Sequence, residues 1–318
     1  MRQPVAREQA PALTPARPAS PPRRGLSLRS RQARLAWLML APALAVVAFV
    51  ALYPLVQTIW LSFTNAQLGS TVSPVSVGLK NYRYLVQDIA FRNSIVVTVK
   101  FTVLTVAIEF VLGLLIALVV NSNFKGRGLT RTAMLIPWAI PTVISAQMWK
   151  WMYQDVYGVI NDLLVNKLGL LGHNVAWLSL PSTSLPAVAA IDIWKTTPFM
   201  ALLLLAGLQV IPSDVYEAAT VDGANRLRQF FDVTLPLLQP AIVVALIFRT
   251  LDALRVFDVF FVAFGNRPDT MTMAIYDQQN IVNFADVGYG SAISMAIFLV
   301  IAIFVVAYVT VFRVEAQR

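Results

Sequence analysis

The sequence predicts an all-α polytopic membrane protein, with six transmembrane helices and a short cytoplasmic helix between the fourth and the fifth. Two observations carry this prediction: 58% of the 318 residues are hydrophobic, and only 13% are charged. A soluble domain carries about 25% charged residues, and its core cannot hide so much apolar material. The mean hydropathy of +0.67 agrees with this. Lipid is therefore the expected solvent for most of the chain.

Residues 1–34 differ from the rest of the chain because they are rich in Pro, Ala and Arg. We expect them to form a disordered cytoplasmic tail. Eight arginines lie there, so the net charge of +9 reflects membrane topology rather than nucleic-acid binding. Residues 35–61 follow without any charge. The apolar region of a signal peptide has only about 7–15 residues, so this run predicts an uncleaved first helix and the start of a transmembrane domain over 35–318.

Five further apolar stretches are long enough, at 1.5 Å per residue, to cross a hydrocarbon core of ~30 Å. If the N-terminus is cytoplasmic, the cytoplasmic segments hold about three times as many Lys and Arg residues as the outer loops. Both termini are therefore expected in the cytoplasm. The six spans are predicted at about residues 35–61, 95–120, 132–153, 185–209, 233–264 and 287–312.

The loop between the fourth and fifth spans, residues 210–232, predicts a short helix with a small-residue face. Asp214 and Glu217 have the spacing of a capping box. Several alanines favour a helix, and Gly223 permits a turn. Such a helix fits a groove on a partner protein, or it lies on the membrane surface. The residues alone leave both interpretations open.

The same loop carries a pattern that resembles the EAA signature of ABC importer permeases. The signature is Glu-Ala-Ala, three residues, Gly, nine residues, a β-branched residue, one residue and Leu-Pro. It is matched by Glu217, Ala218, Ala219, Gly223, Val233, Leu235 and Pro236, with Val233 where Ile is usual. Other stretches are similar to the carbohydrate-uptake branch of this family, of maltose and trehalose type, and especially to the trehalose-type permeases of mycobacterial importers. The stretches that resemble the carbohydrate-uptake branch are NYRYL at 81–85, GVINDLL at 158–164, VAWL at 175–178 and DIWKTTPF at 192–199. Those that especially resemble the mycobacterial trehalose-type permeases are WKTTPFMALLLLAGL at 194–208 and FRTLDALRVFD at 248–258.

The resemblance implies a subunit of an ATP-driven importer that moves a di- or oligosaccharide by alternating access. Its implied partners are a second homologous permease, two ATPase subunits that hold ATP and Mg, and an extracytoplasmic sugar-binding protein. The implied location is the bacterial cytoplasmic membrane. The loop helix would dock on an ATPase subunit through Glu217, Ala218, Ala219, Asp222, Gly223, Arg226, Leu235 and Pro236.

Motifs for catalysis are absent from the sequence. It has no G-x-x-x-x-G-K-[ST] phosphate loop, no cysteine and one histidine. These absences argue against an ATPase site, a disulfide, a thiolate metal site and most histidine-based chemistry. We therefore expect a transport subunit with no catalytic residue, metal or cofactor of its own. The alternative is a secondary transporter driven by an ion gradient, with a buried carboxylate as the proton carrier.

Charged residues inside the predicted spans are costly, and each is a candidate for function. Two interpretations remain open: a polar cavity that hydrogen-bonds sugar hydroxyls, or interhelical salt bridges that fix the bundle. The last four charges alternate in sign at a spacing of three, so neighbours could pair along one helix. The candidates are Glu109, Asp192, Lys195, Arg249, Asp252, Arg255 and Asp258.

Overall fold

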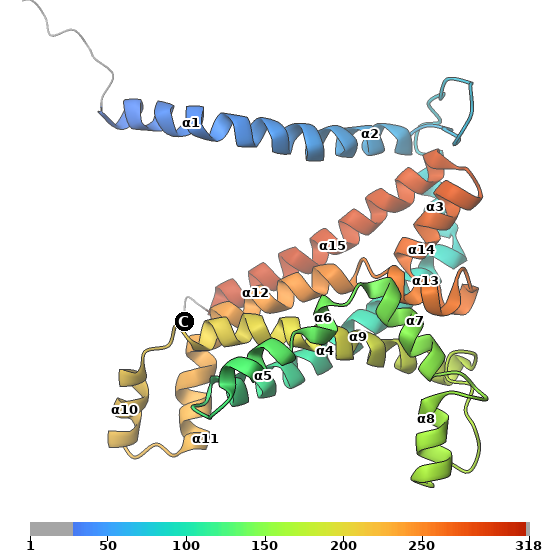
Figure 1. The fold of residues 1–318 in the computed structure, drawn as a ribbon. Helices are drawn as coiled ribbons and strands as arrows, with labels where there is room; N and C mark the ends of the chain where they lie inside the picture. Colours follow the sequence, from blue (N-terminus) through green and yellow to red (C-terminus); the bar gives the residue numbers. More distant parts are fainter. Residues whose placement is uncertain (1–27, 316–318) are drawn as a thin grey trace, which may run out of the picture. The chain divides into compact units, whose positions relative to one another are not determined.

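The computed structural model describes residues 28–315, with side chains described over 32–310 (Figure 1). The chain divides into two units, Met1–Pro54 and Leu55–Arg318. Most of the predicted tail lies outside the described residues. Its last part, residues 28–34, is helical and belongs to the first helix.

The described part of the first unit is a helix with one irregular turn. Helix α1 covers Leu28–Val47, and a π-helical turn, η1, follows over Ala48–Leu52. Pro54 lies in the first turn of α2 (Tyr53–Ser62) and has no backbone N–H to donate to the preceding turn, which accounts for the local widening. The large apolar side chains of α1 are exposed, as expected of a helix that packs in lipid or against another subunit.

The second unit is helical over its described residues and contains only two isolated β-bridges. Five of its described helices exceed ten residues in length, and shorter helices and turns connect them. The elements are α3 (Lys80–Gln87), α4 (Ile89–Asn121), α5 (Arg127–Ala133), α6 (Ile136–Ala139), α7 (Thr142–Met152), α8 (Val159–Asn161), η2 (Asp162–Lys167), α9 (Pro181–Leu208), α10 (Ser213–Val221), α11 (Arg226–Gln229), η3 (Phe230–Thr234), α12 (Leu235–Ala253), α13 (Asp258–Phe264), η4 (Pro268–Thr270), α14 (Met273–Gln278), η5 (Gln279–Asn283) and α15 (Val287–Glu315).

The described chain contains five helical segments that are long and apolar enough to cross a membrane. They agree with five of the six predicted spans. The remaining prediction, residues 132–153, is not one of them. The segments are Gln32–Ser62, Ile89–Asn121, Pro181–Leu208, Arg226–Phe264 and Val287–Thr310.

The predicted third span is divided into α5, α6 and α7. The sharpest break lies between α6 and α7, where Ile140 is extended with φ −71° and ψ 132°. A residue before proline is disfavoured in the helical region, and Pro141 follows Ile140. Proline therefore accounts for the break, and one continuous helix over residues 132–153 is wrong.

Helices α4, α9 and α12 form the centre of the second unit, and α4 packs along α9. Two glycines permit these close contacts. A Cβ on Gly113 of α4 would lie 2.7 Å from Cγ of Met200 on α9, and a Cβ on Gly207 of α9 would lie 2.3 Å from Cβ of Ala241 on α12. Small residues commonly mark close helix–helix contacts in membranes.

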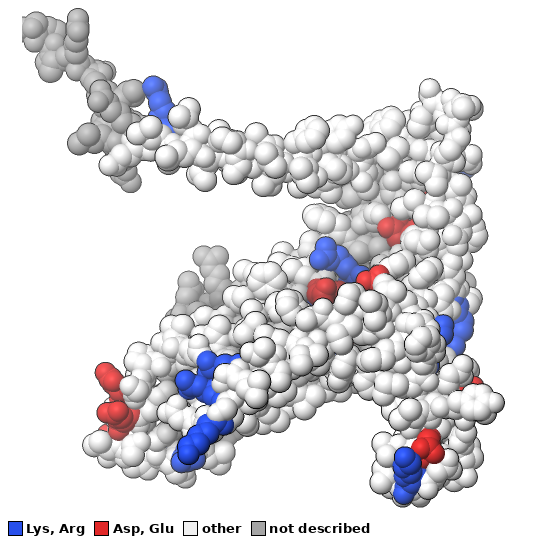
Figure 2. All heavy atoms as spheres, in the orientation of Figure 1, with Lys and Arg blue, Asp and Glu red and all other residues white. Residues whose placement is uncertain are grey.

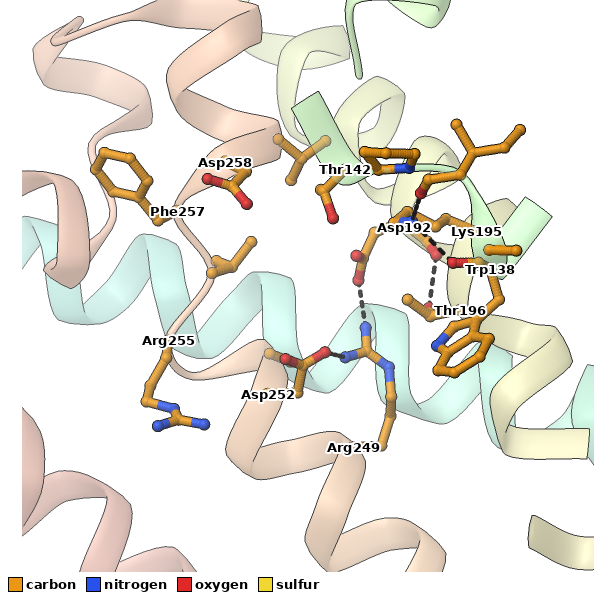
Figure 3. Close-up of a pocket in the computed structure, with 16 residues that line it drawn as sticks. Trp138, Thr142, Asp192, Lys195, Thr196, Arg249, Asp252, Arg255, Phe257 and Asp258 are labelled. Carbon is orange, nitrogen blue, oxygen red and sulfur yellow. Dashed lines mark hydrogen bonds and ion pairs between the residues drawn. The ribbon is translucent and has the colours of Figure 1, made fainter. Parts of the chain in front are cut away.

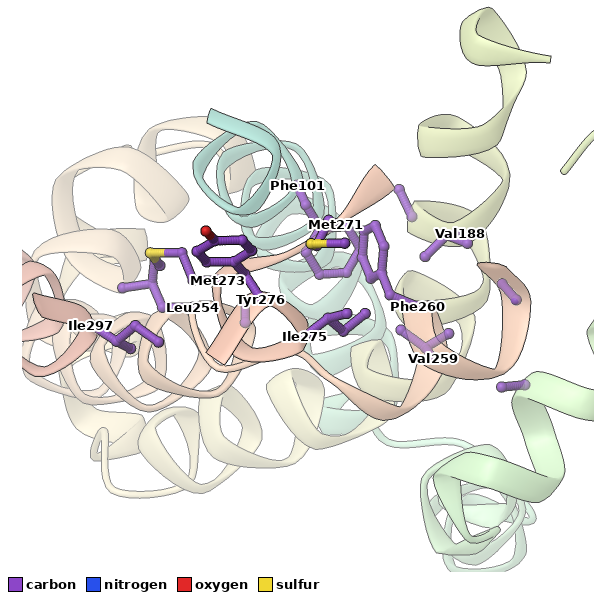
Figure 4. Packing of buried hydrophobic residues seen from close by; sticks show 14 of the residues in the cluster. Phe101, Val188, Leu254, Val259, Phe260, Met271, Met273, Ile275, Tyr276 and Ile297 are labelled. Atoms are coloured by element: carbon purple, nitrogen blue, oxygen red, sulfur yellow. The ribbon is translucent and has the colours of Figure 1, made fainter. Parts of the chain in front are cut away.

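The buried apolar residues form two clusters along these helices. One contains Phe101 and Phe260, whose rings meet edge to face at 4.9 Å (Figure 4). The other contains Met200 and Leu238. On α4, α9 and α12, the predicted intramembrane charges lie in sequence between members of the first cluster and members of the second.

Candidate functional site

The guanidinium group of Arg249 is the centre of a buried ionic cluster. The residue is 2% exposed. Its Nε donates to Oε2 of Glu109 at 2.5 Å, and its Nη2 donates to Oε1 of Glu109 at 3.0 Å. Nη2 also donates to Oδ2 of Asp192 at 2.5 Å, and Nη1 donates to Oδ2 of Asp252 at 2.6 Å (Figure 3). One arginine of α12 therefore binds carboxylates from α4, α9 and its own helix.

Glu109 has no exposed surface, and its carboxylate is fully engaged. In addition to the two bonds from Arg249, its Oε1 accepts a hydrogen bond from Oγ1 of Thr196 at 2.6 Å. Removing one member of a buried ion pair leaves the other uncompensated and costs about 3–5 kcal/mol. Glu109, Asp192 and Arg249 therefore have the ion pairs that the salt-bridge interpretation expects.

Lys195 holds the broken end of α6. It is 7% exposed, and its amine donates to the backbone oxygens of Trp138, at 3.3 Å, and Ile140. Backbone carbonyls at a helix end have no partner within the helix. The charge on Lys195 thus satisfies acceptors that the break before Pro141 leaves free.

A cavity of about 450 Å³ opens beside the ionic cluster. The side chain of Asp252 is 71% exposed and lines this cavity, although its Oδ2 binds Arg249. Arg255 and Asp258 are exposed and also line the cavity, and Figure 3 shows their side chains extending in different directions from the segment after α12. Figure 2 shows acidic and basic side chains gathered around a hollow in this part of the surface. The cavity therefore offers both hydrogen-bond donors and acceptors to a polar ligand.

The four charges from Arg249 to Asp258 do not follow one helix, contrary to our prediction. Helix α12 ends at Ala253, and α13 begins at Asp258. Phe257, between them, has φ −130° and ψ −65°, which is not helical. Among the described residues, the only ion pair within this row is Arg249–Asp252. The interruption turns Arg255 and Asp258 to the cavity instead of leaving them stacked along α12.

The cavity also has members that sequence reasoning did not assign to the polar pathway. Thr142 begins α7 and contributes a hydroxyl group. The ring of Trp138 stacks on Phe199 with centroids 5.6 Å apart and remains 46% exposed. Pro141 is the sequence feature that indicates the break in the helix at this part of the cavity wall. Of the predicted pathway residues, six line the cavity and Glu109 lies behind it.

The predicted partner-binding loop forms a hairpin of α10 and α11 (Figure 1). Gly223 follows α10 with φ +80°, the left-handed conformation that commonly ends a helix. The side chain of Gln229 closes the hairpin, donating to the backbone oxygen of Ala224 at 3.0 Å and to Oγ1 of Thr220 at 2.9 Å. The predicted capping box is wrong: the residue before α10 is Pro212, and no side chain caps this helix end.

The hairpin is exposed and rich in charge. Glu217, Asp222 and Arg226 are exposed, and no ion pair joins them to another residue of the described chain. Figure 2 shows acidic side chains over α10 and basic side chains over the neighbouring elements. Of the other predicted contact residues, Leu235 and Pro236 begin α12, next to the hairpin. Ala218 is exposed, and Ala219 is half-buried.

Several membrane-crossing helices around a polar cavity, with an exposed charged hairpin at one end, define a membrane-embedded transport subunit. Residues 109–316 match the family described as binding-protein-dependent transport system inner membrane component. The match covers most of the chain, and the chain belongs to this family. The predicted resemblance to ABC importer permeases is thereby confirmed, as is a multi-pass protein of the membrane.

Characterised relatives align over nearly the whole chain. The trehalose/maltose transport system permease protein MalF of Thermococcus litoralis is 44% identical over 288 residues, covering 90% of this chain and 96% of that protein. The sulfoquinovosyl glycerol transport system permease protein SmoG of Agrobacterium fabrum is 40% identical, with coverages of 88% and 91%. The trehalose transport system permease protein SugA of Mycobacterium tuberculosis is 39% identical, with coverages of 91% and 92%. These relatives are permeases rather than ATPases, so the expected class of transport subunit is confirmed.

A solved structure shows the same fold. The crystal structure of a bacterial ABC transporter involved in the import of the acidic polysaccharide alginate aligns with a TM-score of 0.75. The alignment covers 89% of this chain and 96% of that chain at 24% identity. The arrangement of helices is therefore that of a known ABC transporter subunit.

Proposed function

We propose that this chain is a permease subunit of an ATP-driven importer that carries a di- or oligosaccharide of the trehalose or maltose type. The observation that carries the proposal is the cavity of about 450 Å³ beside the ionic cluster. Its exposed groups include the carboxylates of Asp252 and Asp258, the guanidinium of Arg255 and the ring of Trp138. Sugar hydroxyls both donate and accept hydrogen bonds, so they match this mixture. The names of the relatives MalF and SugA support this class of cargo.

The division of labour within the cavity follows from accessibility. Four N–H···O contacts already join the guanidinium of Arg249 to three carboxylates. Asp252, Arg255 and Asp258 are exposed and are the groups that would meet the sugar. Asp192, Lys195, Arg249 and Glu109 would act indirectly, by holding the wall of the pathway.

The broken segment α5–α7 would be the remaining one of six crossings. Irregular backbone within a membrane is tolerated where it lines a cavity or is buried in protein. The break at Ile140 lies in the cavity wall, and Lys195 binds the carbonyl there. With this crossing, both termini lie in the cytoplasm, in agreement with the Lys and Arg distribution.

The hairpin of α10 and α11 would receive the movement of an ATPase subunit. Its charges are exposed, and its end at Gly223 is fixed by backbone conformation. ATP and Mg would be held by two such partner subunits, beside a second, homologous permease. An extracytoplasmic binding protein would deliver the sugar, in keeping with the family description and with the alginate transporter, solved in complex with a periplasmic protein. The contact residues would be Glu217, Ala218, Ala219, Asp222, Gly223, Arg226, Leu235 and Pro236.

The test is reconstitution of the complete transporter in lipid with its binding protein. Trehalose, maltose and sulfoquinovosyl glycerol are screened for stimulated ATP hydrolysis and uptake. Asp252→Asn should lower sugar-stimulated hydrolysis about tenfold or more, because a hydrogen bond to a charged group contributes about 1.5–3 kcal/mol. The matched control is Asp155→Asn, an exposed carboxylate outside this cavity.

Each outcome separates the proposal from its rival. Sugar-stimulated hydrolysis that falls in Asp252→Asn but not in Asp155→Asn supports the proposal. Uptake that continues without the ATPase subunits and collapses with the ion gradient would establish a secondary transporter instead. Equal stimulation in both variants would remove Asp252 from the sugar pathway.

A further inference from the structure

A second cavity, of about 490 Å³, lies among elements that the predicted topology places on the extracytoplasmic side. It is bounded by the loop after α2, by α3, by α14 with η5, and by the beginning of α15. Its polar members include Gln67, Lys80, Asn81, Asn280 and Asp286. The membrane-embedded cavity described above shares no lining residue with it.

The walls of this outer cavity are fixed by backbone contacts between distant segments. Gln67 and Asp286 form an antiparallel β-bridge. The N–H of Leu68 donates to the oxygen of Ala285 at 2.8 Å, and the N–H of Gly288 donates to the oxygen of Ala66 at 2.9 Å. The loop after α2 is therefore joined to the start of α15, and the cavity is preformed.

The floor is a tyrosine pair held by one carboxylate. The hydroxyls of Tyr276 and Tyr289 both donate to Oδ2 of Asp88, the latter at 2.5 Å. Burial raises the pKa of Asp88, but these bonds and two backbone N–H groups outweigh burial and hold the pKa below its usual range. The carboxylate thus stays charged and keeps both hydroxyls engaged. The rings, rather than the hydroxyls, of these tyrosines are left for a ligand.

Tyr84 adds an exposed ring at the mouth of the cavity. Its ring meets that of Tyr289 edge to face at a centroid distance of 5.0 Å, and the residue remains 60% exposed. Because Tyr84 is largely exposed, part of its ring is available for contact with a ligand. Apolar C–H faces of a ligand pack on aromatic rings through the same dispersion and area burial that operate in cores.

Two asparagines are oriented so that their oxygens have no partner within the described chain. Nδ2 of Asn280 donates to the backbone oxygen of Tyr276 at 2.8 Å, and Asn280 is only 5% exposed. Nδ2 of Asn81 donates to the oxygens of Ser62 and Thr64, both at 2.9 Å. Asn280 and Asn81 both line the cavity, so their side-chain oxygens are available to accept hydrogen bonds from a ligand.

We propose that this outer cavity is a binding subsite for a neutral, hydroxyl-rich ligand, namely the sugar before it enters the membrane. This inference rests on the proposed function. Fixed amide oxygens accept from hydroxyl groups, Asp286 adds a carboxylate, and Lys80 supplies donors. The exposed ring of Tyr84 receives a C–H face of the sugar. The volume is within the roughly 300–1,000 Å³ range of small-molecule sites.

Because the sequence has no cysteine, an introduced thiol is the only one in this chain, and its modification is followed on this chain after the subunits are separated. In the complete transporter without its binding protein, Gln67→Cys places one thiol at the cavity. Gln87→Cys is the matched control, because Gln87 is exposed on α3 and does not line the cavity. Modification by a maleimide is measured with trehalose, with maltose, and with glycine betaine as an osmolyte without hydroxyl groups.

We expect trehalose or maltose to slow modification of Gln67→Cys alone. At about ten times the dissociation constant the slowing is about tenfold, because only unliganded protein reacts. Tyr84→Ala in the Gln67→Cys background should remove the protection, whereas Tyr84→Phe should retain it. Tyr84 is exposed, so neither substitution threatens folding.

Thr142→Cys, in the membrane-embedded cavity, separates this inference from the proposed function. Protection of Thr142→Cys without protection of Gln67→Cys overturns the outer subsite and leaves the proposed function standing. Protection of neither thiol, with no sugar stimulating ATP hydrolysis, overturns both. If sugar-free binding protein protects Gln67→Cys and sugar alone does not, the cavity is a protein-docking surface and the sugar subsite is overturned.

Discussion

The ionic cluster around Arg249 and the hairpin of α10 and α11 use charge in opposite ways. In the cluster, a guanidinium that is 2% exposed binds three carboxylates from α4, α9 and α12. On the hairpin, Glu217 and Asp222 are exposed and form no ion pair with the described residues. The buried charges of the cluster are thus paired within the chain. Glu217 and Asp222 on the hairpin remain unpaired among the described residues and accessible from outside.

The two regions also differ in what a substitution should change. A buried ion that loses its partner costs several kcal/mol, so the cluster should control folding and assembly. Exposed ion pairs contribute only about 0–1 kcal/mol, so substitutions on the hairpin should leave the fold intact. If the comparison is correct, substitutions in the ionic cluster change the stability of the fold, and substitutions on the hairpin change only its coupling to the ATPase subunits.

The largest effect is expected from Arg249→Met. This change leaves Glu109 and Asp192 buried without their cation, at a cost of about 3–5 kcal/mol. Thermal unfolding and size-exclusion chromatography of the complex should show loss of the assembled transporter. Adding Glu109→Gln to Arg249→Met should recover part of the loss, because one uncompensated charge is removed. An Arg249→Met complex with unchanged stability would contradict the structural role of the cluster.

A smaller effect, confined to coupling, is expected from the hairpin. Glu217→Arg should leave the unfolding temperature unchanged and weaken association with the ATPase subunits about thirtyfold or more, since losing one partner of a buried interfacial charge pair costs about 2–5 kcal/mol. Affinity capture of the ATPase and uptake assays measure this. An exposed charge reversal far from the hairpin, Asp162→Arg, is the control. Normal ATPase capture by Glu217→Arg would argue against docking there.

Gly223 offers a matched pair for the same region. No atom lies within 4 Å of the position a Cβ would take, so only its φ of +80° restricts the choice of residue. Gly223→Asn should be tolerated, because asparagine enters the left-handed region readily. Gly223→Val should strain the turn by about 1–2 kcal/mol and reduce ATPase capture. Equal capture by the two variants would show that this turn does not position the hairpin.

The last prediction concerns a carboxylate of a third kind, which is half-buried and has no cation partner among the described residues. Burial raises the pKa of Asp277 in α14 to about 6, although Oγ of Ser294 donates to its Oδ2 at 2.6 Å and lowers the pKa in part. The folded protein therefore retains a proton that the unfolded chain, with the ordinary pKa of 3.8, has released. Stability falls as pH rises from about 4 through 6.

Asp277→Asn should remove that pH dependence. The gain at neutral pH should be at most about 3 kcal/mol, because each unit of a raised pKa corresponds to about 1.4 kcal/mol. Scanning unfolding temperatures of both proteins between pH 4.5 and pH 7.5 measures it. Parallel curves for the two proteins would contradict a raised pKa.

Much of the fold could be predicted because it depends on local sequence. Hydrophobic length located five crossings, and the EAA pattern located the hairpin. The predicted capping box was wrong although Asp214 and Glu217 had the right spacing. The residue that precedes α10 is Pro212, so Asp214 lies inside the helix instead of capping it. Pro141 is a sequence feature that predicts the break at Ile140. No neighbouring proline predicts the interruption near Phe257.

The charged residues could be predicted as important but not as partners. Arg249 is separated by 140 residues from Glu109 and by 57 residues from Asp192. Only the packing of α4, α9 and α12 decides that they meet. The pairing of Arg249 with Asp252 followed from helical spacing. Arg255 and Asp258 do not continue this row, because α12 ends at Ala253 and α13 begins only at Asp258.

The ionic cluster around Arg249 has a mechanical consequence for a transport cycle. Separating α4 from α12 would leave the guanidinium of Arg249 and the carboxylate of Glu109 buried without their ion pair. The free-energy cost of this is far higher than that of bending the backbone where a helix is already interrupted. We therefore expect α4, α9 and α12 to travel together as one rigid body. The bending that opens the pathway to one side or the other would then fall at the breaks near Ile140 and Phe257, which would serve as the hinges.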